Sequence, residues 1–539
     1  MFTKYRLKQS DADALRTVGW LAGIFLILTM GFALHRYFSF YVTTDHGIFN
    51  QVFWNGTQGR FFESSMSSVL STNVVHDEEL PQVFYHRLGQ HFTPALLLWL
   101  PLYSLFPSPA TLVVLQVALV TAGGIVLYFL ARRSLPTQIA VWITLSYYAA
   151  NAVIGPALGN FYDLCQLPLF LFGMLLALEA RRWLWFWVLA GLVLAIREDT
   201  GVVLFSVGLY LLLSRRSPRA GLAVCLISVG YIVGVTNVVM PLFSQDISRR
   251  FMIERFGQFV DDQEATTLQI VWAMLQNPGL LVQELVTPVK RTLLYLVGHW
   301  LPLAFVPAIA PSTWIMTALP LTQIFLQEDT VPLSINVRYA TAVIPGLFYG
   351  VILWWSHHQE WWKAGVRRFW AVCLALSLFF TFTSNPHRTW SFLLPDSFDP
   401  LIYVSLSRQW EHVSHIYPML EQIPPDASVS ASRYILAHLS NRRALLPFGR
   451  YPKLEYINDA GEVAEIDYII ADLWFPLQYQ GAFKDARGEV QQYNRKLNDL
   501  LTIGAYGLLM FGDGVALAKR GVSSDPVALE AWQNFRRNL

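Results

Sequence analysis

The chain has 539 residues, of which 54% are hydrophobic and only 14% are charged, and it contains 19 tryptophans and 36 phenylalanines. Soluble domains rarely have this composition, so it predicts a membrane protein. The formal net charge is +2, and the basic residues form no continuous stripe, which argues against a nucleic-acid partner.

Long apolar runs recur from the N-terminal region to about residue 384. A helix that crosses ~30 Å of hydrocarbon needs roughly 20 mostly apolar residues. The candidate runs lie near residues 17–38, 109–131, 137–155, 161–180, 183–197, 200–214, 220–241, 290–309, 312–327, 339–356 and 369–384. Two neighbouring runs, 183–197 and 200–214, are short and could form one re-entrant pair. We therefore predict an all-α polytopic membrane protein with about eleven transmembrane helices.

The orientation follows from the basic residues, because Lys and Arg in short loops stay in the cytoplasm. Arginine pairs occur where an eleven-span count returns the chain to that side, at Arg132/Arg133, Arg181/Arg182, Arg215/Arg216 and Arg367/Arg368. The N-terminus is therefore expected to be cytoplasmic and the C-terminal residues external.

The composition becomes more polar near residue 385. The expected parts are a cytoplasmic N-terminus (1–16), a transmembrane domain (17–384) with a first external loop (39–108) and a second external segment (242–289), and an external soluble α/β domain (385–539). In the last part, Ile466–Asp472 is typical of a buried strand, and Gly512–Gly514 is typical of a hairpin turn. We expect these strands to form a core of their own.

Asp45 and His46 follow the first predicted span by only a few residues. A carboxylate at the external membrane surface can have its pKa tuned and can accept a proton from an attacking hydroxyl. Asp45 could equally cap a helix that begins at His46, because aspartate is a common N-cap residue. These residues alone leave both interpretations open.

Further ionisable residues are expected on the same side of the membrane. They include His91, Asp163, Arg197, Glu198, Asp199 and Arg338. Ionisable groups at membrane depth are costly and usually have a functional or a paired role. The Arg197-Glu198-Asp199 triplet could be a structural ion pair at a helix junction. Arg338 could bind a phosphate through its planar guanidinium, or it could extend to the headgroup layer.

A required cofactor is not expected. The three cysteines, Cys165, Cys225 and Cys373, lie in predicted spans without the spacing of metal ligands. The histidines and carboxylates contain no compact motif such as His-Glu-x-x-His, and a divalent cation is the one cofactor that they could hold.

Several strings resemble an uncharacterised bacterial family of multi-pass membrane proteins. They are Asp45–Asn55, Gly59–Phe62, His91–Pro94, Pro101–Tyr103, Phe106–Pro109 with Gln116, Arg197–Gly201 and Arg338–Pro345. That family is grouped with the GT-C superfamily of glycosyltransferases, whose donors are sugars linked to a polyprenyl phosphate.

The resemblance implies a GT-C-like fold, with short helices of the first external loop on the membrane. It also implies a lipid-linked sugar donor, an acceptor that the resemblance does not specify, and a position among the lipids of the plasma (inner) membrane of a bacterium. Asp45 occupies the position of the catalytic base, and Arg338 is the candidate for supporting the leaving phosphate. The other substrate-binding candidates are His46, His91, Asp163, Glu198 and Asp199, with Glu198 or Asp199 as the next choice of base.

Two strings lack a histidine that is common in the family at the same place. Phe161–Leu164 stands where an aromatic-His-Pro-Glu string is common, and Val337–Tyr339 stands where Tyr-His-Tyr is common. A histidine-dependent role at these two places is therefore in doubt.

Two other classes of function compete with an enzyme. One is a transporter or flippase of lipid-linked saccharides, and the other is a non-catalytic membrane assembly protein. Charges in the middle of a span would favour transport, and the predicted spans are nearly free of them.

Overall fold

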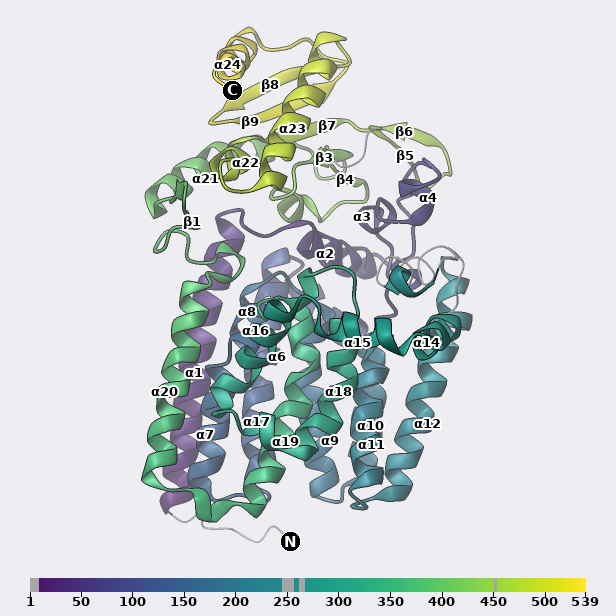
Figure 1. Cartoon of the computed structure of the whole chain (residues 1–539). Helices are drawn as coiled ribbons and strands as arrows, with labels where there is room; N and C mark the ends of the chain where they lie inside the picture. Colours follow the sequence, from purple (N-terminus) through teal and green to yellow (C-terminus); the bar gives the residue numbers. More distant parts are fainter. Residues whose placement is uncertain (1–8, 245–255, 261–266, 450–452) are drawn as a thin grey trace. The chain divides into compact units, whose positions relative to one another are not determined.

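The computed structural model describes residues 9–244, 256–260, 267–449 and 453–539 (Figure 1). The chain divides into two compact units. The first, called the helical unit here, comprises Met1–Ala33, Leu88–Leu98 and Val114–His387. The second, called the α/β unit, comprises Leu34–Arg87, Trp99–Val113 and Arg388–Leu539.

The helical unit is built from apolar helices. They are α1 (Gln9–Phe38), α6 (Pro109–Ala131), α7 (Thr137–Tyr148), α8 (Asn151–Leu158), α9 (Leu167–Glu179), α10 (Trp183–Ile196), α11 (Thr200–Leu213), α12 (Pro218–Gly234), α16 (Val289–Trp300), α17 (Val306–Ile309), α18 (Pro311–Phe325), α19 (Ile344–His357) and α20 (Ala364–Thr383). α1 and α6 each continue into the α/β unit.

Among the described residues, five helical stretches are long and apolar enough to cross a membrane, and the bent pair α7 and α8 makes a sixth if it is one span. α10 and α11 are shorter apolar helices. The expected number of about eleven crossings includes such short helices, so it stays a prediction. The expectation of a mostly helical protein with several apolar helices long enough to span a membrane is confirmed.

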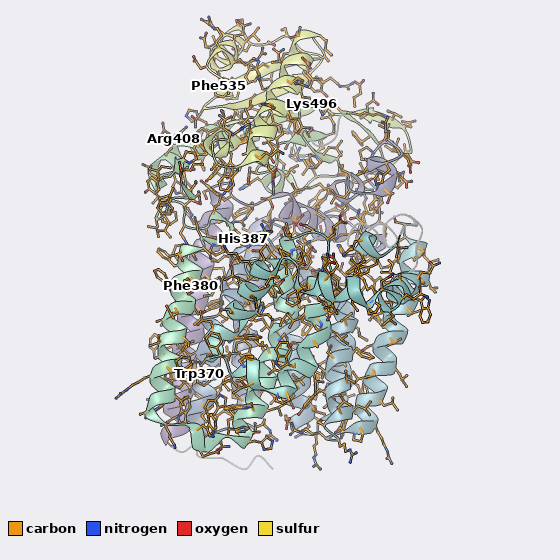
Figure 2. The ribbon with its side chains drawn as sticks, in the orientation of Figure 1. Trp370, Phe380, His387, Arg408, Lys496 and Phe535 are labelled. Atoms are coloured by element: carbon orange, nitrogen blue, oxygen red, sulfur yellow. The ribbon has the colours of Figure 1, made fainter. Side chains whose placement is uncertain are left out.

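The helices show how the unit suits a lipid environment. On α20, Trp370 is buried and donates its indole N–H to the Pro302 carbonyl at 2.9 Å, whereas Phe380 on the same helix is 52% exposed (Figure 2). Between α11 and α12 the backbones approach closely, because a Cβ on Gly221 would lie 2.7 Å from the Gly208 carbonyl oxygen. Small residues allow such close helix packing in membranes, where burial of apolar area supplies little driving force.

The second predicted external segment, 242–289, is described only in part. Residues 245–255 and 261–266 of it lie outside the described residues. The described part contains two amphipathic helices, α14 (Thr267–Gln276) and α15 (Pro278–Val286).

The α/β unit contains a five-stranded sheet in the order β4-β3-β7-β9-β8. Its strands are β3 (Val429–Ala431), β4 (Leu445–Pro447), β7 (Tyr468–Asp472), β8 (Tyr506–Gly512) and β9 (Val515–Arg520). β3 pairs in parallel with β4 and β7, and β9 pairs antiparallel with β7 and β8. The predicted strand at Ile466–Asp472 is β7, and the predicted turn joins β8 to β9. That this part lies outside the membrane stays a prediction.

Helices cover both faces of this sheet. They are α21 (Leu406–Glu421), α22 (Trp474–Tyr479), α23 (Lys484–Thr502) and α24 (Pro526–Arg537). Successive side chains of a strand point to opposite faces. Accordingly Ile470 of β7 packs in one apolar cluster with Ile416 of α21, and Ile469 packs in another with Leu497 of α23 and Trp532 of α24.

The expectation that these strands form a core of their own is met on one face of the sheet only, where the apolar cluster of Ile469 contains no residue of the first loop. The first loop forms α2 (Thr44–Thr57), α3 (Ser65–Ser68), α4 (Thr72–Val75) and α5 (Leu100–Leu105). Phe40, Ile48 and Met66 from this part of the chain belong to the same apolar cluster as Ile470 and Leu517. On this face, the first loop and the C-terminal sheet therefore share one hydrophobic core.

Candidate functional site

A sharp turn between α10 and α11 carries the Arg197-Glu198-Asp199 triplet. Arg197 ends α10 in an extended conformation, with φ −165° and ψ 156°. The Thr200 hydroxyl, at the start of α11, lies 2.6 Å from the Val193 carbonyl and 2.7 Å from that of Arg197, so it ties the end of α10 to the turn. With this local geometry Arg197 and Asp199 face each other, whereas Glu198 faces His91.

Arg197 forms the buried centre of one charged cluster. Its Nε and Nη2 donate to the two carboxylate oxygens of Asp199 at 2.7 and 2.5 Å, and its Nη1 lies 3.7 Å from Asp163 Oδ1. Asp163 also accepts a hydrogen bond from the Leu164 amide at 2.8 Å. A buried charge is tolerated when it is paired and hydrogen-bonded. Of the two readings of this triplet, the structural ion pair therefore describes Arg197 and Asp199.

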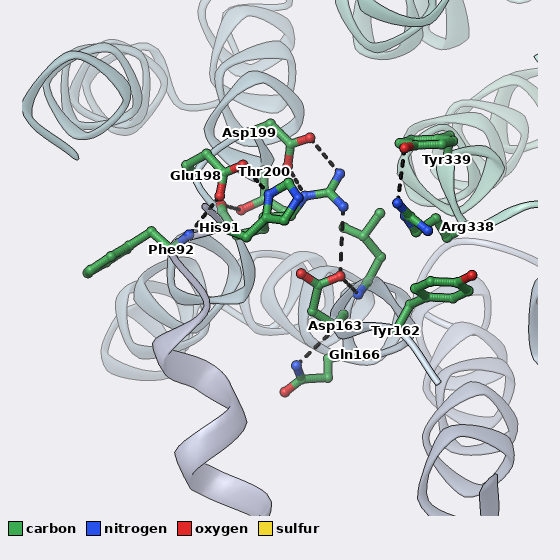
Figure 3. Close-up of polar contacts among 12 residues, drawn as sticks. His91, Phe92, Tyr162, Asp163, Gln166, Glu198, Asp199, Thr200, Arg338 and Tyr339 are labelled. Carbon is green, nitrogen blue, oxygen red and sulfur yellow. Dashed lines mark hydrogen bonds and ion pairs between the residues drawn. The ribbon is translucent and has the colours of Figure 1, made fainter. Parts of the chain in front are cut away.

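Glu198 has different partners from the carboxylate beside it. Its Oε1 lies 2.8 Å from His91 Nδ1, and its Oε2 accepts a hydrogen bond from the Phe92 amide at 2.9 Å (Figure 3). Burial, with the nearby Asp199 carboxylate, raises the pKa of Glu198 to about 7, against the attraction of Arg197. A carboxyl group whose pKa lies near the working pH is suited to general acid or base chemistry.

Arg338 lies between two tyrosine rings. Its guanidinium carbon is 4.4 Å from the ring centre of Tyr162 and 4.8 Å from that of Tyr339, and it donates to the Tyr339 hydroxyl at 3.1 Å. The Tyr162 amide in turn donates to Gln116 Oε1 at 3.0 Å. Figure 3 shows these rings and Arg338 in the same region of the helical unit as Asp163 and Asp199. The stacking fixes the plane of a cation that can pair with an anion.

A cavity of about 270 Å³ opens beside Glu198. His91, Glu198 and Asp199 form part of its lining, and most of the remainder is apolar, including Val202 of α11 and Ile232 of α12. The helical unit thus joins an ionisable pair to an apolar space. Such a combination is typical of a ligand site.

Asp45 and His46 belong to the α/β unit, whereas the other predicted site residues lie in the helical unit. α2 begins at Thr44 with Thr43 as its N-cap, so the interpretation of Asp45 as the cap is wrong. His46 is fully buried, and its Nε2 lies 2.9 Å from the Pro109 carbonyl oxygen. Burial lowers the pKa of His46 to about 4, so the ring is neutral near pH 7. The roles expected of Asp45 and His46 stay predictions.

The other polar residues of α2 form a buried network that the sequence analysis missed. Asn50 donates to Asn441 Oδ1 at 2.6 Å and accepts from the Tyr103 hydroxyl at 2.7 Å. Gln51 donates to the Arg442 carbonyl at 2.9 Å and accepts from the Ser64 hydroxyl at 2.7 Å. These bonds join the first loop to the C-terminal residues. Asn50 and Gln51 therefore have structural roles, although they stand in the string that resembles the bacterial family.

A second polar cluster lies in the α/β unit around His412. The two ring nitrogens of His412 lie 2.8 Å from Asp513 Oδ2 and 3.3 Å from Asp472 Oδ2. Burial acts to lower the pKa of His412, but the two carboxylates outweigh it and raise that pKa. Arg408 also donates to Asp513, at 2.8 Å. Because each member is bonded to another, we interpret this cluster as a structural tie between α21 and the sheet.

The described histidines, cysteines and carboxylates do not form a metal site. No group of three or more His, Cys, Asp and Glu side chains among the described residues could hold a metal ion. Arg197 takes both oxygens of Asp199, and the oxygens of Glu198 are taken by His91 and the Phe92 amide. The divalent cation that the sequence leaves open stays a prediction.

Comparisons with known proteins agree with the fold. The model of a family of predicted membrane proteins, DUF2079, matches residues 36–517. The crystal structure of ArnT from Cupriavidus metallidurans bound to undecaprenyl phosphate has a TM-score of 0.50 and 12% identity, and the match covers 94% of this chain and 99% of that one. At this identity the likeness shows the fold alone. No curated protein matches the sequence.

Proposed function

Because this chain belongs to the DUF2079 family of predicted membrane proteins and has the fold of a GT-C glycosyltransferase, we propose that it is itself a membrane glycosyltransferase. Its donor is a sugar linked to a polyprenyl phosphate. The observation that carries the proposal is the Glu198–His91 pair at the edge of a largely apolar cavity. That arrangement supports proton transfer next to a lipid-like substrate.

The proposed reaction is a single displacement at the anomeric carbon. The acceptor hydroxyl oxygen forms a bond to this carbon, and the bond from the carbon to the phosphate oxygen breaks. The electron pair leaves with the lipid phosphate, and the hydroxyl proton passes to a carboxylate base. Transfer of this kind needs a base and a group that stabilises the charge developing on the phosphate.

We assign the base role to Glu198, with Asp45 as the alternative that the family resemblance implies. Glu198 is favoured by its raised pKa and by its position in the cavity wall. With Glu198 ionised, the Nδ1–H of His91 donates to it and fixes its orientation. Arg338 is the candidate for the leaving phosphate, since a guanidinium can pair with two phosphate oxygens.

Asp163 and Asp199 have a supporting role in this proposal. Both carboxylates face Arg197, and they hold its charge inside the helical unit. They thereby stabilise the turn from which Glu198 projects. A direct contact of either residue with substrate is not needed for the proposed chemistry.

Two conservative variants test the choice of base. We expect Glu198→Gln in the full chain to lower sugar transfer by roughly 10²- to 10⁴-fold, because the amide cannot accept the proton. Asp45→Asn should keep most of the activity. The measurement is transfer from a panel of polyprenyl-phosphate sugars in proteoliposomes.

Glu328→Gln is the matched control, because Glu328 is an exposed carboxylate of the same unit. Loss of transfer in Asp45→Asn with full turnover in Glu198→Gln would assign the base to Asp45. Movement of the lipid-linked sugar across the membrane without transfer by the wild type would contradict the enzyme proposal and favour a flippase.

A further inference from the structure

The cavity beside Glu198 has the size and lining of a site for an apolar chain. Its volume is about 270 Å³, whereas an engineered apolar cavity of about 150 Å³ already binds benzene. Its apolar wall comes from several helices, with Val202 on α11, Ile232 on α12, Met274 on α14 and Leu319 on α18. An occupant would therefore bury several carbon atoms there.

The polar residues that line this cavity favour some ligand head groups over others. It carries the carboxylates of Glu198 and Asp199 with His91, and none of its described lining residues is Lys or Arg. Arg197, the nearest cation in sequence, is already bound to Asp199 through two hydrogen bonds. Among the described lining residues, a phosphate would therefore meet two carboxylates and neither Lys nor Arg, and like charges repel. A hydroxyl group can instead donate to Glu198.

Arg338 is not among the described residues that line this cavity. It lines a different, much smaller space of about 20 Å³, together with Tyr162 and Gln116. The cation suited to a phosphate and the apolar cavity with an acidic edge are thus two distinct features of the helical unit.

We propose that the larger cavity binds the acceptor, and that the acceptor is an uncharged amphiphile with an apolar chain and a hydroxyl head group. The identification of this ligand as the acceptor rests on the proposed function, but the binding of an uncharged amphiphile in the cavity does not. The hydroxyl lies against Glu198, and the chain lies along Val202, Ile232 and Met274. The phosphate of the donor lies outside this cavity, at Arg338 as in the proposed function.

Two probes with the same chain separate the head groups. Farnesol and farnesyl phosphate would each be titrated against the full-length protein in detergent, with binding measured by calorimetry and by the shift in thermal unfolding. We expect farnesol to bind, and Val202→Phe to weaken that binding at least tenfold by filling the cavity. Any binding of farnesyl phosphate should change less than twofold in this variant.

Val229→Phe on α12 is the matched control, because Val229 is 47% exposed and is not part of the cavity lining. Met274→Phe fills the cavity from a different helix, so agreement of the two filling variants would show that lost volume is the cause. If either variant fails to fold, the other one gives the result.

Three outcomes would overturn the proposal. One is farnesol that does not bind, or that binds as well to both filling variants as to the wild type. Another is that the filling variants weaken the binding of farnesyl phosphate as much as that of farnesol, since the cavity would then hold a phosphate-bearing lipid. The third is farnesene, the hydrocarbon without the hydroxyl, binding as tightly as farnesol. A protein that transfers sugar but shows one of these outcomes would keep the proposed function and lose only the assignment of the cavity.

Discussion

At the scale of single residues, two carboxylates that are adjacent in the sequence have different bonding partners. Asp199 makes two hydrogen bonds to Arg197, whereas Glu198 is held by His91 and the Phe92 amide. Pairs of titratable groups whose surroundings separate their pKa values are typical of sites that move protons. The turn between α10 and α11 achieves this separation within three residues.

This difference predicts how the activity depends on pH. Burial raises the pKa of Glu198 to about 7, and a base accepts a proton only in its ionised form. Transfer should therefore be constant above this pH and fall by about tenfold per pH unit well below it. The measurement is kcat between pH 5 and 9 in proteoliposomes, with protein integrity checked at each pH.

The variant Asp45→Asn serves as the comparison and should show the same profile as the wild type. A wild-type rate that stays constant down to pH 5 would contradict Glu198 as the base.

At the scale of elements, α2 is the helix whose role differs most from its appearance in the sequence. Most of its residues are buried, including His46, Asn50, Gln51 and Asn55. Their polar groups are hydrogen-bonded inside the α/β unit. A buried amide is tolerated only when it is paired, so these residues specify how the first loop packs.

We expect Gln51→Ala to destabilise the α/β unit. The substitution leaves the Ser64 hydroxyl and the Arg442 carbonyl without their present partner, and each buried orphan costs about 1–3 kcal/mol. The check is hydrogen exchange of the α2 and β7 amides, which should become faster together. Gln58→Ala is the control, because Gln58 is exposed at the end of the same helix. Equal exchange in the two variants would show that the network contributes nothing measurable.

At the scale of the whole molecule, the boundary between the units does not follow the order of the chain. Leu34–Arg87 and Trp99–Val113 fold with Arg388–Leu539, and they share a hydrophobic core with its sheet. Removing the C-terminal residues would therefore expose Phe40, Ile48 and Met66 of the first loop to solvent. A shortened chain that ends near residue 387 is expected to be poorly folded for this reason.

The orientation in the membrane can be tested with two single cysteines. The distribution of arginine pairs predicts that Ser523 is external and Ser214 cytoplasmic, and both side chains are exposed. A membrane-impermeant thiol reagent should label Ser523→Cys in cells with a permeabilised outer membrane and an intact inner membrane. It should label Ser214→Cys only after the inner membrane is opened. The three native cysteines are buried, which keeps the background low.

The reverse labelling pattern would invert the topology. It would also place the proposed chemistry in the other compartment.

The sequence alone determined those properties that depend on local composition and spacing. Apolar runs predict a membrane protein, the apolar run at 466–472 predicts a strand, and Gly512–Gly514 predicts a hairpin, because each pattern acts through neighbouring residues. The resemblance to a GT-C-related family likewise depends on short strings of consecutive residues. The number of crossings is less certain in such reasoning, since a short helix such as α10 resembles half of a longer span.

Only the tertiary structure decided which charged groups are paired and which core each segment joins. His91 and Glu198 are separated by 107 residues and meet through a 2.8 Å contact. Ile48 and Ile470 share one apolar cluster although they lie at opposite ends of the chain. Burial and partner choice depend on contacts between distant segments, and the energy of a buried polar group depends on its partner. For this reason the sequence indicated Glu198 and Asp199 as equal candidates. Only the fold distinguished Asp199, a structural carboxylate, from Glu198, the candidate base.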